Sequence, residues 1–192
     1  TLAFSAVVAA LSASLRLPHP GLLLTLGGYF GLLFLTSYLR NSVWALPAVF
    51  ALTGFMGYTL GPLIAAYLAL PSGAGIVATA MGTTAAIFVG LTWYASLSSA
   101  PDMSRFGSFL MVGILTAFGL GLAAYFFSMP ALSLAVSGMF ILLMSGLIMY
   151  QTQAIVRGGE DNYVMATVTL FVSIYNLFAS LLQILGVLGG EE

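Results

Sequence analysis

The sequence predicts an all-α integral membrane protein that folds as a bundle of seven transmembrane helices. Of its 192 residues, 61% are hydrophobic and only 5% are charged, whereas a soluble domain is about a quarter charged. The apolar residues form long unbroken runs, and a helix needs about 20 of them to cross the hydrocarbon core. A β-barrel would need short segments that alternate apolar and polar residues. Helices are therefore the consistent interpretation.

Turn-forming and charged residues divide the chain into seven apolar runs. Each interruption contains proline, glycine, arginine or a cluster of polar residues, which are typical of connections between helices. No soluble domain or long linker separates the runs, so we expect a single transmembrane domain over residues 1-192. Its approximate spans are 1-15, 21-39, 44-70, 75-97, 107-127, 131-155 and 163-188.

The first run is short for a membrane span. It opens at Thr1 without an initiator methionine or a charge, so we expect that this helix begins upstream and that a cytoplasmic N-terminal tail is missing. The alternative is a signal peptide that ends near Ser12 to Ser14. That alternative requires a basic N-terminal region, which these residues do not provide.

Glycines mark the second and third runs. Gly54, Gly57 and Gly61 have the spacing i, i+3 and i+7, which places them on one side of a helix and permits close backbone approach. Pro62 removes a backbone donor and should bend the helix. We predict close packing with a kink, and a gate or ion-lining segment is the alternative. The Gly27 to Gly31 step in the second run is a weaker GxxxG motif, for which we predict packing.

The seventh run carries a stripe of polar residues with the spacing i, i+4, i+7, i+11 and i+14, which is one face of an α-helix. Its members are Thr169, Ser173, Asn176, Ser180 and Gln183. Asn176 lies near the middle of the run, where an amide without partners would cost several kcal/mol. The sixth run offers Ser137, Ser145 and Gln151. We predict interhelical hydrogen bonds, and a polar lining for water or cations is the alternative.

The arginines predict the orientation of the bundle. With seven spans, Arg40, Arg105 and Arg157 share one side and Arg16 lies on the other. By the positive-inside rule the N-terminus is cytoplasmic and the C-terminus lies outside. The formal net charge is -1, so there is no basic surface for nucleic-acid phosphates. We therefore expect the lipid bilayer as a partner and no nucleic acid.

The residues needed for catalysis are largely missing. The chain has no cysteine and one histidine, His19 in a proline-flanked loop, so neither a Ser-His triad nor a His-Glu zinc motif can be assembled. No run carries a charge in its middle, which disfavours a carboxylate-based pump. Glu160 and Asp161 could bind a divalent cation weakly, but capping of the last helix by Asp161 or Asn162 is the more consistent role. We predict no enzyme, cofactor or metal site.

Several motifs run in order along the whole chain. The two longest are Thr53-Gly-Phe-Met-Gly-Tyr-Thr-Leu-Gly-Pro62 and Ala166-Thr-Val-Thr-Leu-Phe-Val-Ser-Ile-Tyr-Asn-Leu-Phe178. The others cover residues 2–5, 20–26, 102–104, 129–132, 158–163 and 181–186. Through these motifs the sequence resembles the Bax-inhibitor family of seven-helix membrane proteins, and its bacterial YccA branch in particular. Collinear matches of this extent are more specific than an isolated motif.

The resemblance implies an inner-membrane protein with a cytoplasmic N-terminus and a periplasmic C-terminus. It also implies a role as a modulator and slowly degraded substrate of the FtsH membrane protease, in association with the HflK and HflC proteins. Such a protein acts by binding, and the resemblance implies that its cytosolic tail is the handle for degradation.

The resemblance also implies a relation to other members of the wider family, which behave as pH-sensitive calcium leak channels in which two aspartates on the last two helices share a proton and latch the pore. Their motifs place Gln151 and Ser173 at those two positions of this chain. Neither an amide nor a hydroxyl titrates in the physiological range, so the aspartate latch does not carry over. Two alternatives stay open, a differently gated cation leak channel lined by Gln151, Ser173 and Asn176, and a structural or assembly subunit of a larger membrane complex.

Overall fold

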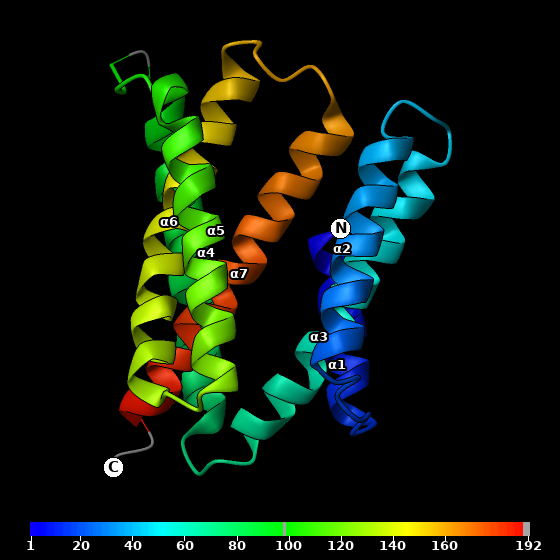
Figure 1. Cartoon of the computed structure of the whole chain (residues 1–192), viewed down its shortest axis with the longest axis vertical. Coiled ribbons are helices and arrows are strands. Elements are labelled where there is room, and N and C mark those ends of the chain that lie inside the picture. Colours follow the sequence, from blue (N-terminus) through cyan, green and yellow to red (C-terminus); the bar gives the residue numbers. More distant parts are fainter. Residues whose placement is uncertain (98, 190–192) are drawn as a thin grey trace. The chain divides into compact units, whose positions relative to one another are not determined.

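The computed structural model describes residues 1–97 and 99–189, and the regular secondary structure of this part of the chain is helical (Figure 1). Seven α-helices and one short 3-10 helix, η1, follow in chain order. Every α-helix begins and ends within two residues of the run that predicts it. The elements are α1 (Leu2–Ser14), α2 (Leu22–Leu39), α3 (Ala45–Leu68), α4 (Gly73–Ser96), η1 (Ser104–Phe106), α5 (Gly107–Phe126), α6 (Pro130–Val156) and α7 (Tyr163–Gly189).

Six of the described helices, α2 to α7, are long and apolar enough to cross a membrane. The first helix, α1, has 13 residues and is therefore about 20 Å long at 1.5 Å per residue, short of the hydrocarbon thickness of about 30 Å. The all-α architecture with seven helices is thus confirmed, with six candidate spans and one short apolar helix. The side of the membrane on which each terminus lies stays a prediction.

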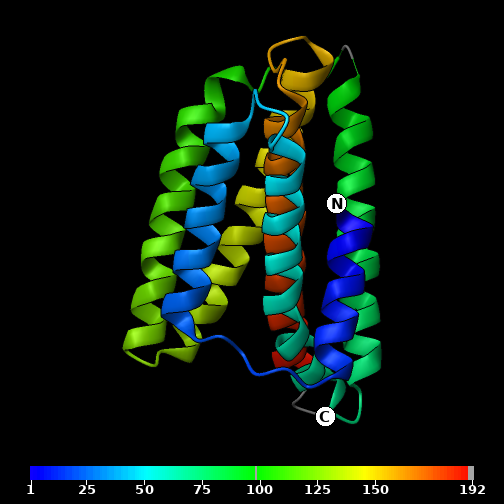
Figure 2. The same cartoon turned by 90° about the vertical axis from the view of Figure 1, so that its right-hand side faces the viewer.

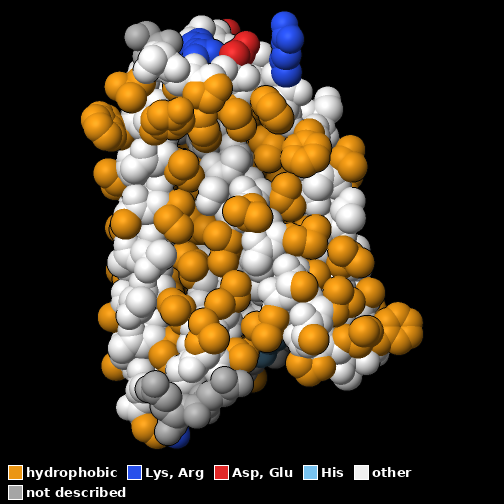
Figure 3. Space-filling view, turned by 90° about the vertical axis from the view of Figure 1, so that its left-hand side faces the viewer, with side chains coloured by type: hydrophobic (Ala, Val, Ile, Leu, Met, Phe, Trp, Pro, Cys, Tyr) orange, Lys and Arg blue, Asp and Glu red, His pale blue; other side chains and the backbone are white. Residues whose placement is uncertain are grey.

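The outward surface of these helices is apolar. Orange hydrophobic side chains are spread over the face seen in Figure 3, and the coloured charged side chains lie near its upper and lower edges. Leu23 and Tyr38 on α2 are each 86% exposed, and Phe127 after α5 is 76% exposed. A surface of this kind suits lipid, since hydrocarbon cannot satisfy exposed polar groups.

The described chain divides into two compact units. The first contains residues 1–74 and 162–171, and the second contains residues 75–161 and 172–189. The continuous helix α7 belongs to both, because its residues up to Phe171 pack in the first unit and those from Val172 onward pack in the second. The expectation of one domain stays a prediction.

In the first unit, α3 packs against both α1 and α2. Figure 2 shows the cyan α3 between the dark blue α1 and the lighter blue α2. Pro62 lies inside α3, which continues to Leu68. The last turns of α3 lean out of line with its first turns in Figure 1, as expected where a proline interrupts the backbone ladder.

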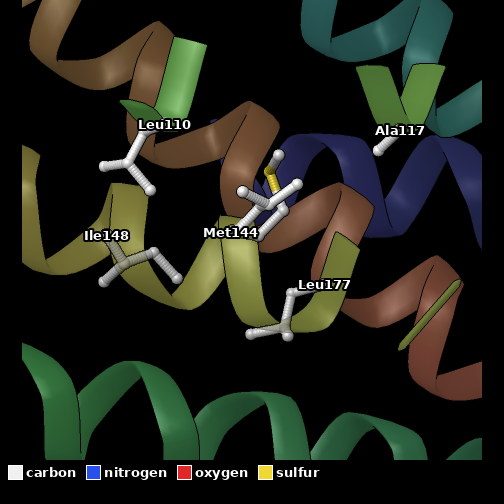
Figure 4. Packing of buried hydrophobic residues seen from close by; sticks show 6 residues of the cluster. Leu110, Ala117, Met144, Ile148 and Leu177 are labelled. Carbon is white, nitrogen blue, oxygen red and sulfur yellow. The ribbon is translucent and has the colours of Figure 1, made fainter. Parts of the chain in front are cut away.

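The core of the second unit is a cluster of apolar side chains from α5, α6 and α7, which Figure 4 shows from close by. Two glycines admit leucines of the facing helix: a Cβ on Gly113 would lie 2.6 Å from Leu143 Cδ2, and a Cβ on Gly146 would lie 2.9 Å from Leu110 Cδ2. Each of α5 and α6 therefore inserts one leucine into the space that a glycine leaves on the other helix. The buried members are Leu110, Ala117, Leu143, Met144, Ile148 and Leu177.

Candidate functional site

One end of the predicted polar stripe forms a hydrogen-bonded cluster between α6 and α7. The amide of Gln183 donates to Ser133 Oγ at 2.6 Å and accepts a hydrogen bond from Ser137 Oγ at 2.8 Å. Ser137 also contacts the Ser133 carbonyl of its own helix at 3.1 Å. Both the oxygen and the nitrogen of the Gln183 amide are therefore hydrogen-bonded to side chains of the neighbouring helix, as expected for a polar residue that stabilises a contact between two membrane helices.

Asn176 uses its amide differently from the prediction. Its Nδ2 donates to the Val172 carbonyl of its own helix at 2.8 Å, so this hydrogen bond is intrahelical and does not join two helices. An asparagine can satisfy its amide locally in this way because the carbonyl at i−4 lies within reach of the side chain. Periodicity places a residue on a face, and it does not show whether the side chain reaches across that face.

The other members of the stripe are distributed over both units. Thr169 lies in the first unit, while Ser173 and Ser180 lie in the second. Ser173 is completely buried and Ser180 is buried. The residues of the stripe are therefore divided between the two units, and any role of these residues as a pore stays a prediction.

Two buried glutamines lie near the end of α6, and they differ in the hydrogen bonding of their amide groups. Gln151, one of the predicted candidates, is 5% exposed, and its Nε2 has no hydrogen-bond partner among the described residues. Gln153, which the sequence analysis did not single out, is 3% exposed. It accepts a hydrogen bond from the Met103 N–H at 2.9 Å and donates to the Pro101 carbonyl at 2.8 Å.

Arg157 extends this contact. Its Nη1 forms an ion pair with Asp102 Oδ1 at 3.2 Å, and its Nη2 donates to the Ala100 carbonyl at 3.3 Å. We call Gln153 and Arg157 the loop clamp, since together they bind the segment between α4 and η1 to the end of α6. Hydrogen bonds from the Ser104 backbone N–H and hydroxyl, with the nearby Arg157 and Arg105, hold the pKa of the Asp102 carboxyl below its ordinary value.

The glycine stripe of α3 faces α1. A Cβ on Gly57 would lie 2.9 Å from Ser5 Oγ and closer still to the Ser5 carbonyl oxygen, and a Cβ on Gly61 would collide with Ser12. Gly54 lies against the Phe4 ring, which a Cβ would approach to 3.0 Å. The stripe therefore lets two helix backbones approach closely.

Hydrogen bonds add to the contact between α1 and α3. Ser12 Oγ donates to the Tyr58 carbonyl at 3.0 Å, and the Tyr58 hydroxyl donates to the Pro18 carbonyl at 2.8 Å. The Tyr58 interaction fixes the chain just after α1. A role of this segment as a gate stays a prediction.

In α2 the packing glycine is a different one from the predicted pair. A Cβ on Gly27 or Gly31 would meet nothing within 4 Å, whereas a Cβ on Gly28 would overlap the Phe55 ring of α3. The prediction that Gly27 and Gly31 pack against a neighbouring helix was therefore wrong, because Gly28 is the glycine of this segment that lies against α3. A spacing of four places both glycines on one face, but the sequence does not say which face meets a neighbour.

The polar loop before α7 ends in a helix cap. Asn162 Oδ1 accepts hydrogen bonds from the N–H groups of Val164 and Met165 at 3.1 and 3.0 Å, which confirms the predicted capping role. Its Nδ2 donates to Asn41 Oδ1 at 2.8 Å, so the same side chain ties the turn after α2 to the start of α7. Among residues 1–97 and 99–189, no group of three or more His, Asp or Glu side chains could hold a metal ion.

Comparisons with known proteins cover essentially the whole chain. A family model described as inhibitor of apoptosis-promoting Bax1 matches residues 1–190. An uncharacterized protein of Pseudomonas aeruginosa is 50% identical over 192 residues, which is 100% of this chain and 86% of the relative. The Escherichia coli K12 protein named modulator of FtsH protease YccA is 48% identical over 186 residues, 97% of this chain and 84% of that protein. A protein of Escherichia coli O6:H1 with the same identity and coverage is named inner membrane protein YccA.

Proposed function

The chain belongs to the Bax-inhibitor family, and from this premise we propose that it is an inner-membrane modulator of an FtsH-type protease that acts by binding and not by catalysis. The observation that carries the proposal is the 48% identity, over 97% of the chain, with the protein named modulator of FtsH protease. The match covers 97% of the chain, so the proposal concerns the whole helical bundle and not one isolated motif.

The proposal includes an orientation and further partners. The loops that hold Arg40, Arg105 and Arg157 lie on the cytoplasmic side by the positive-inside rule, and the C-terminus lies in the periplasm. The protein is itself a slowly degraded substrate of the protease and associates with HflK and HflC proteins. Slow degradation allows it to occupy the protease and so protect other substrates.

The contacts inside the bundle support binding through the outer helix faces. Two of the three glutamines, Gln153 and Gln183, have their amides hydrogen-bonded to neighbouring residues. Six large apolar side chains of α2 are exposed, and Thr36 is the buried residue of that helix. The six are Leu23, Leu24, Phe30, Phe34, Leu35 and Tyr38. Apolar outer faces of this kind suit contact with the transmembrane helices of a membrane-anchored protease, where packing drives association.

The alternative of a cation leak channel has less support. Its lining would rest on Gln151, Ser173 and Asn176, none of which carries a charge, and Asn176 donates an amide hydrogen to a carbonyl of its own helix. A cation in a membrane interior needs charged or densely arranged oxygen ligands. We therefore favour the modulator.

Copurification tests the proposal. The full-length protein, expressed at its natural level, should copurify with the FtsH-type protease through a mild detergent, and its overexpression should lengthen the lifetime of another membrane substrate of that protease. An unrelated seven-helix protein at the same expression level serves as the control. Loss of the protease during purification, together with an unchanged substrate lifetime, would rule out the modulator.

A further inference from the structure

The segment between α1 and α2, residues 15–21, contains the one histidine of the chain. In Figure 2 this segment runs from the lower end of the dark blue α1 to the lower end of the lighter blue α2. His19 is exposed, and its Nδ1 accepts a hydrogen bond from the Gly21 backbone N–H at 3.1 Å. The neutral imidazole therefore carries its proton on Nε2 and presents the lone pair of Nδ1 to the start of α2.

Gly21 is the residue at which α2 begins. It is the N-cap of the helix, and its φ of 86° with ψ of 161° is a conformation that glycine adopts readily and other residues rarely do. Its carbonyl accepts hydrogen bonds from the Thr25 N–H at 3.0 Å and from the Thr25 hydroxyl at 2.7 Å. Gly21 therefore joins the first turn of α2 through its carbonyl and His19 through its N–H.

Two other hydrogen bonds hold the segment. The Leu17 N–H donates to the Ser12 carbonyl of α1 at 3.1 Å. The Tyr58 hydroxyl of α3 donates to the Pro18 carbonyl at 2.8 Å. Histidine is the side chain that ordinarily changes its charge between about pH 5 and 8, so the bond from the imidazole to the start of α2 is the pH-dependent one of the three.

The surroundings of His19 offer a protonated imidazole no acidic partner. The helices that the segment joins or contacts, α1, α2 and α3, carry no charged side chain. Residues 1–74 and 162–171, which make up this unit, contain no Asp or Glu. Arg16 is the other charged side chain of the segment and has the same sign, and Tyr58 is the titratable side chain that α3 places against it. Protonation therefore brings no ion pair within the unit to offset a lost hydrogen bond.

We propose that His19 is a pH-sensitive switch at the start of α2. The neutral ring holds the Gly21 N–H. When Nδ1 takes up a proton from water, its lone pair is used, and the Nδ1–H and the Gly21 N–H are then two donors that face each other. The hydrogen bond is lost, and the first turn of α2 is released until the proton leaves again. The switch depends neither on the membrane orientation nor on the protease-modulator proposal.

Nuclear magnetic resonance of the whole protein in nanodiscs tests the switch, with nitrogen-15 in histidine and glycine. Between pH 8 and 5, we expect the Gly21 amide signal to shift with the same midpoint as the ring nitrogens of His19. The Gly28 amide, which lies inside α2, should not shift in this range. A Gly21 signal that stays fixed while the ring takes up its proton would overturn the proposal.

Two substitutions separate the switch from a general effect of acid. His19→Asn supplies an oxygen that can accept the N–H two residues later, as in asparagine turns, and that does not titrate, whereas His19→Ala supplies no acceptor. Hydrogen exchange of the Thr25 amide, corrected for the intrinsic dependence of exchange on pH, gives the measurement. In the native protein it should be about fivefold faster at pH 5 than at pH 8, the factor that corresponds to a net hydrogen bond of about 1 kcal/mol.

The two variants should each lose this dependence on pH in opposite ways. His19→Asn should exchange slowly at both pH values, and His19→Ala should exchange rapidly at both. An acceleration at pH 5 that is as large in His19→Asn as in the native protein would overturn the proposal. Slow exchange of His19→Ala at both pH values would also overturn it, because the first turn of α2 would then not depend on the imidazole.

Discussion

The contact between α1 and α3 in the first unit and the contacts of α6 in the second unit hold helices together by different means. Between α1 and α3 the side chains are small, and the backbone of Ser5 approaches Gly57 so closely that no Cβ fits. Around α6 the contacts depend on amides, with Gln153 bound to a loop and Gln183 bound to two serines. In lipid, where apolar burial gives no driving force between helices, close approach and hydrogen bonds are the two available sources of affinity. Close approach is most pronounced between α1 and α3, where hydrogen bonds add to it, and amide hydrogen bonds are most pronounced around α6, where glycines also admit leucines of the facing helix.

The largest effect is expected where a bulky residue is inserted between α1 and α3. Gly57→Leu should destabilise the fold by about 3 kcal/mol, because the new side chain meets the Ser5 backbone, which cannot rotate away as a side chain could. Thermal unfolding in detergent gives the measurement. Gly27→Leu is the matched control, since a Cβ there meets nothing within 4 Å, and it should change stability little. Equal effects of the two substitutions would show that close approach does not hold α1 and α3 together.

The next effect concerns the loop clamp. Gln153→Met should cost about 2 kcal/mol, because it leaves the Met103 N–H and the Pro101 carbonyl without their buried partner. The same variant should also expose the segment before η1 to limited proteolysis. Gln153→Glu is a graded control, since a carboxylate still accepts from Met103 but cannot donate to Pro101. A Gln153→Met protein with native stability and native protease resistance would contradict the clamp.

A smaller effect compares two members of the polar stripe. Gln183→Leu should destabilise the fold by about 1 kcal/mol, typical of a hydrogen bond between membrane helices, because Ser133 and Ser137 lose their partner. Asn176→Leu removes a hydrogen bond within its own helix and should cost clearly less. Unfolding of both variants under identical detergent conditions decides the order. The reverse order would mean that Asn176, as the sequence suggests, is the interhelical residue.

The smallest effect is a dependence on pH. Because the pKa of the Asp102 carboxyl is lowered in the folded state, chiefly by hydrogen bonds from Ser104, its contribution to stability is fully present above the ordinary value of 3.8 and is lost as the pH falls through the lower folded value. Between pH 5 and 8 this group should therefore leave stability unchanged. Asp102→Asn should remove the loss of stability that protonation of this carboxyl causes at acid pH, as measured by the melting temperature as a function of pH. An acid-dependent loss of the same size in the variant would assign it to other carboxyls.

The helices were predictable from the sequence because the length of an apolar run and its punctuation act locally. The cap by Asn162 was predictable for the same reason, since its partners are the next residues of the chain. The spacing of Gly54, Gly57 and Gly61 places them on one face of α3, but it does not identify α1 as their partner. Helix pairing depends on contacts between distant segments, which a single sequence does not encode in its periodicity.

Two side chains illustrate why the candidate site was harder to predict. Gln153 lies two residues after Gln151 and therefore does not share the face of the sixth helix on which Ser137 and Gln151 were predicted to lie. Its partners are backbone groups of a loop about 50 residues earlier in the chain. A polar residue near the end of an apolar run gives only a weak signal, since such places are often solvated. For Asn176 the face was known but the reach of the amide was not, so a bond within its own helix was not foreseen.

The most direct test of the proposed modulator is the rate at which the purified FtsH-type protease degrades a second membrane substrate in liposomes, with and without the full-length protein. We predict that equimolar addition slows degradation of that substrate and that Gly57→Leu, which disrupts the packing of α1 on α3, weakens the inhibition. The Gly27→Leu control should inhibit like the native protein. An unchanged degradation rate at a several-fold excess of native protein would contradict the modulator.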